Sequence, residues 1–258
     1  MYQMNAIRLR ILSRLQNLQM KNVNWMKNKQ YVLMFHSICE RPNWYDRDYC
    51  MTPRTFENMI IELERRRCQF LPIEMLQHRE DSKEVYLTFD DGFLDFYENA
   101  YPILKKHHIP FTIFLTLDYI NKRNYLTWEQ ILELSENSLC TIGCHTYTHK
   151  QLSECSITEL RKEIIIVKEK MEEKLKKEVN FFAYPYGTLP KVHLCAPLFV
   201  WGAGYRKAFS TLATPVNSSS RYFIPRINMN ERNWKLQIVH CIIGSRNLEL
   251  ADQGSAVG

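Results

Sequence analysis

Two adjacent carboxylates follow an apolar run in residues 85–93, VYLTFDDGF, where Asp90 and Asp91 precede Gly92. Asp-Asp-Gly after a strand is ordinary turn chemistry, because aspartate bonds its own backbone and glycine accepts a positive φ. Two neighbouring carboxylates can also divide two tasks between them, with one binding a metal ion and the other acting as a general base. The rest of the chain has to decide between a turn and a reactive site.

A second pattern with possible chemistry is HTYTH, which places His145 and His149 four residues apart. On a helical turn both side chains share one face and can bind one ion, although a structural histidine pair fits the same spacing. A rival zinc site would add Cys140 and Cys144. Because neighbouring side chains on an extended segment point to opposite faces, we expect Cys144 to face the core, which removes the cysteines as ligands.

Two further motifs end apolar runs. In MFHS, His36 closes the first run, and in FAYPYG the residues Tyr184, Pro185 and Tyr186 lead into Gly187. The second motif is either a simple turn or a rigid loop that presents the backbone N–H of Tyr186.

The elements that position these motifs alternate along the chain. Strand-forming runs are expected at 31–35, 85–89, 111–115, 181–184 and 208–212, and helices at 55–67, 93–107, 127–136 and 157–177. This alternation predicts an α/β fold with parallel strands, either a barrel or an open sheet. In a βα barrel the loops after the strands gather on one face, so the four motifs are expected to meet there.

The expected constellation can hold a catalytic metal. Asp91, His145 and His149 would give three ligands and leave one position open. Asp90 beside them is then the general base. Zinc is the default ion for such ligands, with nickel, cobalt or iron as alternatives.

Attack on a carbonyl also needs an oxyanion donor and a proton for the leaving group. We expect the backbone N–H of Tyr186 to serve as the donor. His36 is the best remaining histidine to supply the proton.

The ordered motifs resemble those of a known family. LTFDDG, HTYTH and FAYPYG, with MFHSI before them and GYRKAFST and IPRINM after them, look like the polysaccharide deacetylases, carbohydrate esterase family 4 with the NodB homology domain. The histidine on the first strand is similar to the permuted branch that includes poly-β-1,6-N-acetylglucosamine deacetylases. The resemblance covers roughly residues 30–240. It implies a distorted (β/α)7 barrel and metal-dependent hydrolysis of N-acetyl groups on an acetamido sugar, releasing acetate.

Carried over by motif, the resemblance implies the same roles for Asp91, His145, His149, Asp90, His36 and Tyr186. One position departs from the pattern. Many members carry an arginine shortly before the Pro-Tyr of the third motif to orient the base, whereas here that region reads EVNFFAYPYG. We expect Arg226 in IPRINM to substitute for it, and we place Tyr184, Pro185 and Arg226 at the substrate.

The net charge of +6 is confined to one arm. Residues 1–29 hold six basic residues and no acidic one, so the remaining chain is neutral and a nucleic-acid surface is not expected. The arm has a helical apolar period, which fits either an amphipathic helix on an anionic membrane or a helix packed on the body. We expect a single deacetylase domain over 30–243 between this arm and a loose tail over 244–258.

The sequence also indicates a compartment. No export signal or membrane span is visible, and eight scattered cysteines without a CxxC pair suit a reducing environment, so we expect a cytoplasmic protein. It would be membrane-associated if the arm is the amphipathic helix and not a helix packed on the body. Two other functions remain open: a sugar O-acetyl esterase using the same site, and a non-catalytic carbohydrate-binding protein on a degenerate deacetylase fold.

Overall fold

A computed structural model of the chain describes residues 30–40, 49–77, 83–214, 216 and 221–238. Its larger sheet has the strand order β10-β1-β5-β6-β7-β8-β9, with β4 paired to β5 outside this path, and every strand pair is parallel. The strands are β1 Tyr31–Phe35, β4 Gln69–Phe70, β5 Glu84–Asp91, β6 Phe111–Leu115, β7 Cys140–Cys144, β8 Phe181–Ala183, β9 Lys207–Phe209 and β10 Ile227–Asn228. Two short strands, β2 Ser37–Ile38 and β3 Cys50–Met51, form a separate parallel pair.

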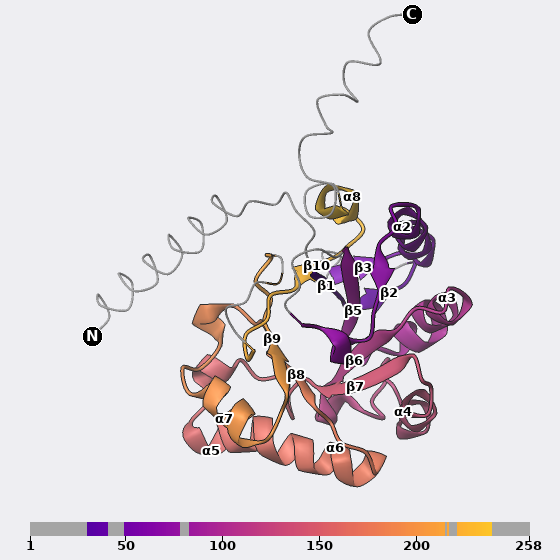
Figure 1. Ribbon diagram of the computed structural model, residues 1–258. Helices are drawn as coiled ribbons and strands as arrows, with labels where there is room; N and C mark the ends of the chain where they lie inside the picture. The colour runs from indigo at the N-terminus through magenta and orange to yellow at the C-terminus, as the bar shows by residue number, and fades with distance from the viewer. Residues whose placement is uncertain (1–29, 41–48, 78–82, 215, 217–220, 239–258) are drawn as a thin grey trace, which may run out of the picture.

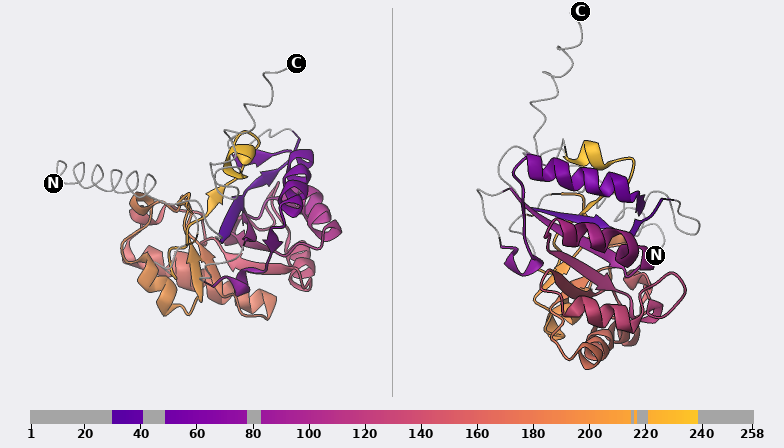
Figure 2. Two further views of the ribbon diagram at one scale, coloured as in Figure 1. Left: turned by 45° about the horizontal axis from the view of Figure 1, so that its top comes forward. Right: turned by 90° about the vertical axis from the view of Figure 1, so that its right-hand side faces the viewer.

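Helices surround the sheet in chain order (Figure 1). The α-helices are α2 Pro53–Arg65, α3 Tyr101–Lys106, α4 Trp128–Ser135, α5 Ile157–Leu160, α6 Val167–Leu175, α7 Ala196–Gly202 and α8 Trp234–Gln237. Two π-helical segments join them, η3 Phe96–Ala100 before α3 and η6 Arg161–Ile166 between α5 and α6, and short 3₁₀ turns are η2 Ile73–Met75, η4 Leu117–Tyr119, η5 Leu152–Glu154 and η7 Leu189–Lys191. In the right-hand view of Figure 2, α2, α3 and α4 lie one below another on one outer side.

Local sequence signals start these helices. Helix α5 starts with a capping box, in which the Ser156 side chain accepts from the Glu159 N–H and the Glu159 side chain accepts from the Ser156 N–H. Thr127 and Gln130 form the same arrangement at α4. Each cap satisfies backbone donors that a helix leaves unpaired at its first turn.

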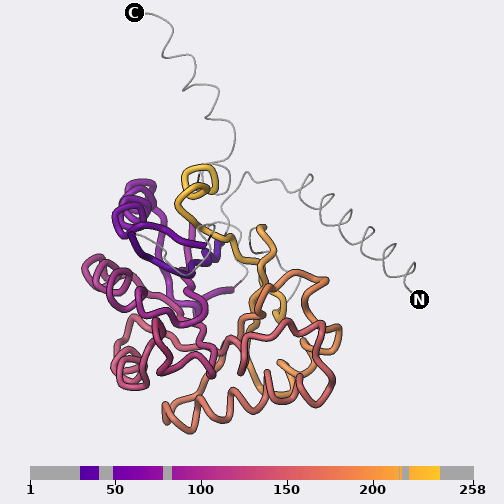
Figure 3. The backbone as a smooth tube through the Cα atoms, turned by 180° about the vertical axis from the view of Figure 1, so that it is seen from behind, coloured from indigo at the N-terminus to yellow at the C-terminus, as the bar shows by residue number. Residues whose placement is uncertain are grey.

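The curled sheet closes only part of a barrel. β1 pairs with both β5 and β10, so the last described strand lies beside the first, as the tube in Figure 3 also shows. Between β9 and the segment leading into β10 there is a single parallel bridge, Phe209 to Ile224. This architecture agrees with the predicted distorted (β/α)7 barrel.

Strand alternation divides the core into two layers. On β5, Leu87 and Phe89 belong to the larger apolar cluster that packs under the helices. Tyr86 belongs to a second cluster with Phe114 and Phe209, which fills the interior of the curled sheet. The next two residues of β5 on the interior face, Thr88 and Asp90, are polar and belong to the site described below.

The predicted N-terminal arm and C-terminal tail lie outside the described residues. None of the helices in the described ranges combines the length and apolarity that crossing a membrane requires.

Gly143 in the middle of β7 provides a test of this packing. A Cβ there would stand 2.5 Å from the Phe114 ring and 2.9 Å from the Phe181 carbonyl oxygen. Gly143→Ala should lower the free energy of unfolding by about 1–3 kcal/mol, the usual cost of overpacking, in chemical denaturation. Gly202→Ala is the matched control, because a Cβ at this helical position meets nothing within 4 Å, and it should leave stability unchanged or raise it. Equal effects of the two changes would contradict the packing.

Candidate active site

The two aspartates end β5 and are both buried, with 2% and 3% of Asp90 and Asp91 exposed. Alternation along β5 points Asp90 to the same interior face as Tyr86. Asp91 would then point outward, but its own φ of 73° and the φ of 78° at Gly92 turn the backbone sharply. The reversal therefore starts at Asp91, one residue before Gly92.

The histidine pair follows β7 in a loop. Nε2 of His149 lies 3.1 Å from Oδ1 of Asp91, and Nε2 of His145 lies 3.5 Å from the same oxygen. The predicted helical turn is wrong, because residues 145–149 form an irregular loop with positive φ at Thr146 and His149. The convergence itself is present: one ligand atom from each of the three residues lies within 4.8 Å of the others.

The chemistry of this group suits a divalent metal ion. Nδ1 of His145 lies 2.8 Å from the Ala183 carbonyl oxygen, which can only accept, so Nδ1 carries the hydrogen and Nε2 directs its lone pair at Asp91. Burial lowers the pKa of His145 to about 4, which keeps its imidazole neutral, as a ligand must be. An imidazole lone pair facing a carboxylate oxygen requires a positive charge between or beside them.

Asp91 and His149 form a charged pair at the same place. Burial acts to raise the pKa of Asp91, but the hydrogen bond and charge of His149 hold it well below its usual range. Burial likewise acts to lower the pKa of His149, and the bond to Asp91 raises it overall. A bound metal ion would take the place of the proton on His149.

The rival site with two cysteines is not formed. Cys144 is fully buried and contacts Tyr205, as expected for a residue that faces the core. Cys140 lies at the opposite end of β7 from His145. Within the described ranges, the only group of metal-binding side chains is that of Asp91, His145 and His149.

Arg226 stands just before β10 and binds Asp90 on β5, across the intervening strand β1. Its two terminal nitrogens bind the two oxygens of Asp90 at 2.7 Å each, and the guanidinium also donates to Thr88 Oγ1 at 3.2 Å and to the Ser210 carbonyl at 3.0 Å. The Arg226 side chain is fully buried and lies 5.3 Å from the centre of the Phe114 ring. The hypothesis that Arg226 orients Asp90 therefore has a direct geometric basis.

This arginine keeps Asp90 ionised. Burial acts to raise the pKa of Asp90, but the charge and the hydrogen bonds of Arg226 lower it below its ordinary value. Nε2 of His145 lies 3.9 Å from Asp90, so this second carboxylate stands directly beside the group formed by Asp91, His145 and His149.

His36 follows β1 at the same end of the sheet and is 9% exposed. Its ring centre lies 4.8 Å from that of Tyr49. Burial lowers the pKa of His36, while the charges of Asp90 and Asp91 act in the opposite direction. The next residues are anchored by Asp95, which accepts from the Ser37 hydroxyl and the Ile38 N–H.

The third motif is a tight turn with an unusual residue at its third position. The Gly187 N–H donates to the Tyr184 carbonyl at 3.1 Å, and Tyr186 takes a φ of 59° where glycine is usual. In the described part of the chain the Tyr186 N–H donates no hydrogen bond. The Tyr186 ring is 53% exposed and lies 5.2 Å from the His149 ring.

The expected substrate contacts need correction. Tyr184 is fully buried and its hydroxyl donates to the Tyr222 carbonyl, so its side chain supports the turn. Pro185 is also buried, and Arg226 is occupied with Asp90. All three side chains are buried and therefore not accessible to a sugar.

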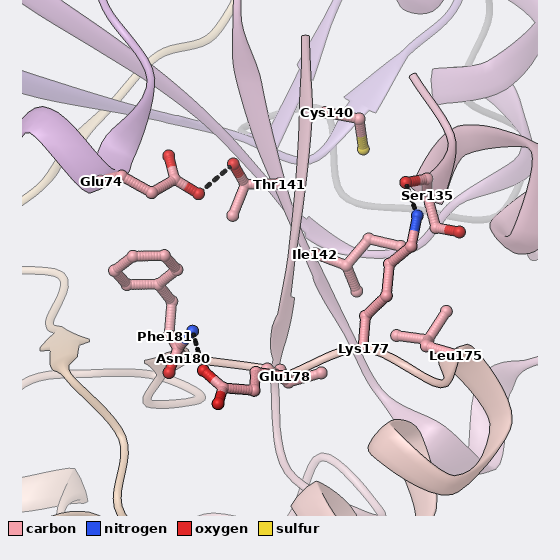
Figure 4. A pocket seen from close by; sticks show the side chains of 11 residues that line it. Glu74, Ser135, Cys140, Thr141, Ile142, Leu175, Lys177, Glu178, Asn180 and Phe181 are labelled. Atoms are coloured by element: carbon pink, nitrogen blue, oxygen red, sulfur yellow. Dashed lines mark hydrogen bonds between the residues drawn. The ribbon is translucent and has the colours of Figure 1, made fainter. Parts of the chain in front are cut away.

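A cavity of about 150 Å³ lies elsewhere, at the amino ends of β7 and β8. In its lining the Thr141 hydroxyl donates to Glu74, and Lys177 donates to the Ser135 carbonyl (Figure 4). The aspartates and histidines stand at the carboxyl ends of the strands, so this cavity is separate from the candidate site.

Comparisons with known proteins agree with this geometry. The model of the polysaccharide deacetylase family matches residues 77–196. The chain is 30% identical to the poly-β-1,6-N-acetyl-D-glucosamine N-deacetylase of Staphylococcus aureus strain MRSA252, covering 83% of this chain and 77% of that protein. The chain belongs to the polysaccharide deacetylase family. The family and the enzyme class, a hydrolase, are thus confirmed.

Solved structures show that this deacetylase shares a fold with several others. One is a polysaccharide deacetylase from Bacillus cereus, with a TM-score of 0.74 and 22% identity over 84% of this chain and 69% of that chain. Another is IcaB from Ammonifex degensii, with a TM-score of 0.69 and 22% identity over 83% and 97%. The predicted α/β fold of the NodB type is confirmed.

Sequence reasoning missed two further partners of Arg226, Thr88 and the Ser210 carbonyl. Thr88 stands two residues before Asp90 on β5, so strand alternation alone could have placed both on one face. The Ser210 carbonyl carries no sequence signal, because any residue offers a backbone oxygen.

Removing Arg226 should be costly, because it leaves the Asp90 charge buried without a partner. Arg226→Met should lower the free energy of unfolding by about 3–5 kcal/mol at pH 7, measured by denaturant titration. Arg206→Met is the control, since its pair with Glu178 is largely exposed and should contribute at most about 1 kcal/mol.

The difference in unfolding free energy between wild type and Arg226→Met should depend on pH. Because Arg226 depresses the pKa of folded Asp90, the pair stabilises the protein above the unfolded-state pKa of about 3.9. This contribution is lost as the pH falls through the folded-state pKa, so wild type and variant should converge in strong acid. An equal difference in unfolding free energy at pH 7 and in strong acid would contradict this assignment.

Proposed function

We propose that this deacetylase hydrolyses N-acetyl groups of an acetamido sugar, with β-1,6-linked N-acetylglucosamine as the first substrate to try. The observation that carries the proposal is the pair of adjacent carboxylates with separate partners: Arg226 on Asp90, and two histidines on Asp91. The 30% identity to a staphylococcal protein named for this reaction supports the substrate class.

Asp91, His145 and His149 would hold the metal ion, with zinc as the first choice for mixed histidine and carboxylate ligands. When bound, the ion would polarise the acetyl carbonyl and lower the pKa of a water molecule. Three protein ligands leave room for these oxygens, as a catalytic rather than a structural site requires.

The remaining steps fall to groups of the chain. Asp90, ionised and held by Arg226, accepts the proton of the attacking water. The Tyr186 N–H donates to the oxyanion that forms on the former carbonyl oxygen. His36, in its protonated form, donates the proton that the leaving amine needs. Acetate and a free amino sugar result.

The location of the substrate stays a prediction from the sequence. We propose a cytoplasmic enzyme acting on a lipid-linked or soluble precursor, with the basic N-terminal arm near an anionic membrane. Acetate release from a lipid-linked acetamido sugar, compared with release from polymer, tests this. Activity on polymer alone would contradict it.

Metal removal and two aspartate variants test the division of roles. Metal-stripped protein resupplied with zinc should release acetate from β-1,6-linked N-acetylglucosamine oligomers. Asp90→Asn should lose about 10²–10⁴-fold in turnover while still binding zinc, whereas Asp91→Ala should lose zinc. Asp118→Asn, an exposed aspartate beyond β6, is the control, and circular dichroism confirms folding. Wild-type turnover in Asp90→Asn would refute its role as base.

The acid is tested by comparing two leaving groups. An amine must be protonated to leave, whereas the alcohol of an O-acetyl ester leaves more easily. His36→Ala should therefore reduce N-acetyl hydrolysis by about 10²–10⁴-fold and ester hydrolysis much less. A small, equal effect on both substrates would show that another group is the acid, and ester activity alone would favour the esterase alternative.

A further inference from the structure

A buried carboxylate lies behind the loop that carries His149. Glu163, in the π-helical segment η6, is 3% exposed. Its Oε2 accepts from the backbone N–H groups of Tyr147 and Thr148 at 2.9 Å each, and its Oε1 accepts from the Thr148 hydroxyl at 2.7 Å. All three donors come from the segment between the two histidines.

This loop has a backbone that needs support. Thr146 and His149 take φ values of 67° and 62°, a region that costs free energy for residues with a side chain. The Thr146 hydroxyl accepts from the His149 N–H at 3.0 Å and closes the loop on itself. The N–H groups at 147 and 148, inside this closure, must be satisfied from outside it.

Glu163 accepts hydrogen bonds from both of these N–H groups. Two successive N–H groups that point at one oxygen form a small anion-binding concavity. We propose that Glu163 is a positioning residue for the metal site: by binding Tyr147 and Thr148 it fixes the loop so that Nε2 of His149 stays beside Asp91. This rests on the proposed function, because it takes the loop as part of a metal site.

The chemistry of the contact requires a carboxylate. Glutamine would keep the size of Glu163 but offer only one acceptor oxygen, and its NH₂ group would face donors where an oxygen now accepts. Glu163→Gln therefore removes part of the support without opening a cavity. Residues that orient metal ligands from behind typically contribute 10–100-fold to metal affinity.

The experiment uses zinc alone, titrated into the metal-stripped full chain against a chromophoric chelator. Glu163→Gln should weaken zinc binding about 10–100-fold. In the metal-free protein, hydrogen exchange should show faster exchange of the Tyr147 and Thr148 amides in the variant. Wild-type zinc affinity in Glu163→Gln would overturn the proposal.

Glu172→Gln is the matched control. Glu172 lies in the adjoining helix α6, and its Oε1 accepts from the Val179 N–H at 2.8 Å, before β8 and far from the histidines along the fold. It should alter stability without changing zinc affinity. An equal drop in affinity in both variants would overturn the positioning role, because general destabilisation would then explain it.

Two arms keep the test decisive. If the wild type binds no zinc, the metal site of the proposed function fails. Hydrogen exchange of the Tyr147 and Thr148 amides still decides whether Glu163 holds the loop. If these amides exchange as slowly in Glu163→Gln as in the wild type, the positioning role is overturned. If Glu163→Gln does not fold, Thr148→Val removes only the hydroxyl bond. In Thr148→Val, a loss of zinc affinity smaller than the about 10–100-fold expected for Glu163→Gln supports the proposal. Unchanged zinc affinity in Thr148→Val contradicts it.

Discussion

The buried ion pair between Arg226 and Asp90 is the constraint on which the rest of the site depends. It lies inside the curled sheet and joins β5 to the segment entering β10, two strands that flank β1. A charge buried there without its partner would cost several kcal/mol. The partly closed barrel and the ionised base therefore require each other: only the closed sheet places the guanidinium against Asp90, and only the pair makes a buried guanidinium tolerable.

Around this pair, residues with a strained backbone follow or end three strands, β5, β7 and β8. Of the nine non-glycine residues with positive φ in the described ranges, Asp91, Thr146, His149 and Tyr186 belong to the candidate site. Such conformations persist only where the surroundings fix them. At Tyr186 the fixing contact is the Thr211 hydroxyl, which donates to its carbonyl. Neighbouring strands and helices thus stabilise a geometry that the local sequence disfavours.

The parts that sequence could predict are those governed by local pattern. Apolar runs located β1, β5, β6, β8 and β9 because buried parallel strands need them, and loops after parallel strands had to gather on one face. These runs did not include β7, whose sequence CTIGC is short and contains a glycine. The turn at 145–149 was mispredicted as helical because the spacing of two histidines says nothing about φ at Thr146. Tyr184 was misplaced at the substrate because the sequence does not show which side of a turn is buried. The partnership of Arg226 with Asp90 spans 136 positions, and only the resemblance suggested it.

The two adjacent aspartates have different partners, which suits the different roles proposed for them. Two carboxylates this close repel each other unless each has its own positive partner. Asp90 has Arg226, whose fixed charge cannot be lost by deprotonation, and both its oxygens are engaged. Asp91 faces two imidazoles, of which His145 is neutral and His149 exchangeable between a proton and a metal ion. Under the proposed function, a cation that entered the site would meet one carboxylate already neutralised by arginine and one that still needs a positive partner. It would therefore bind Asp91 and leave Asp90 to accept a proton.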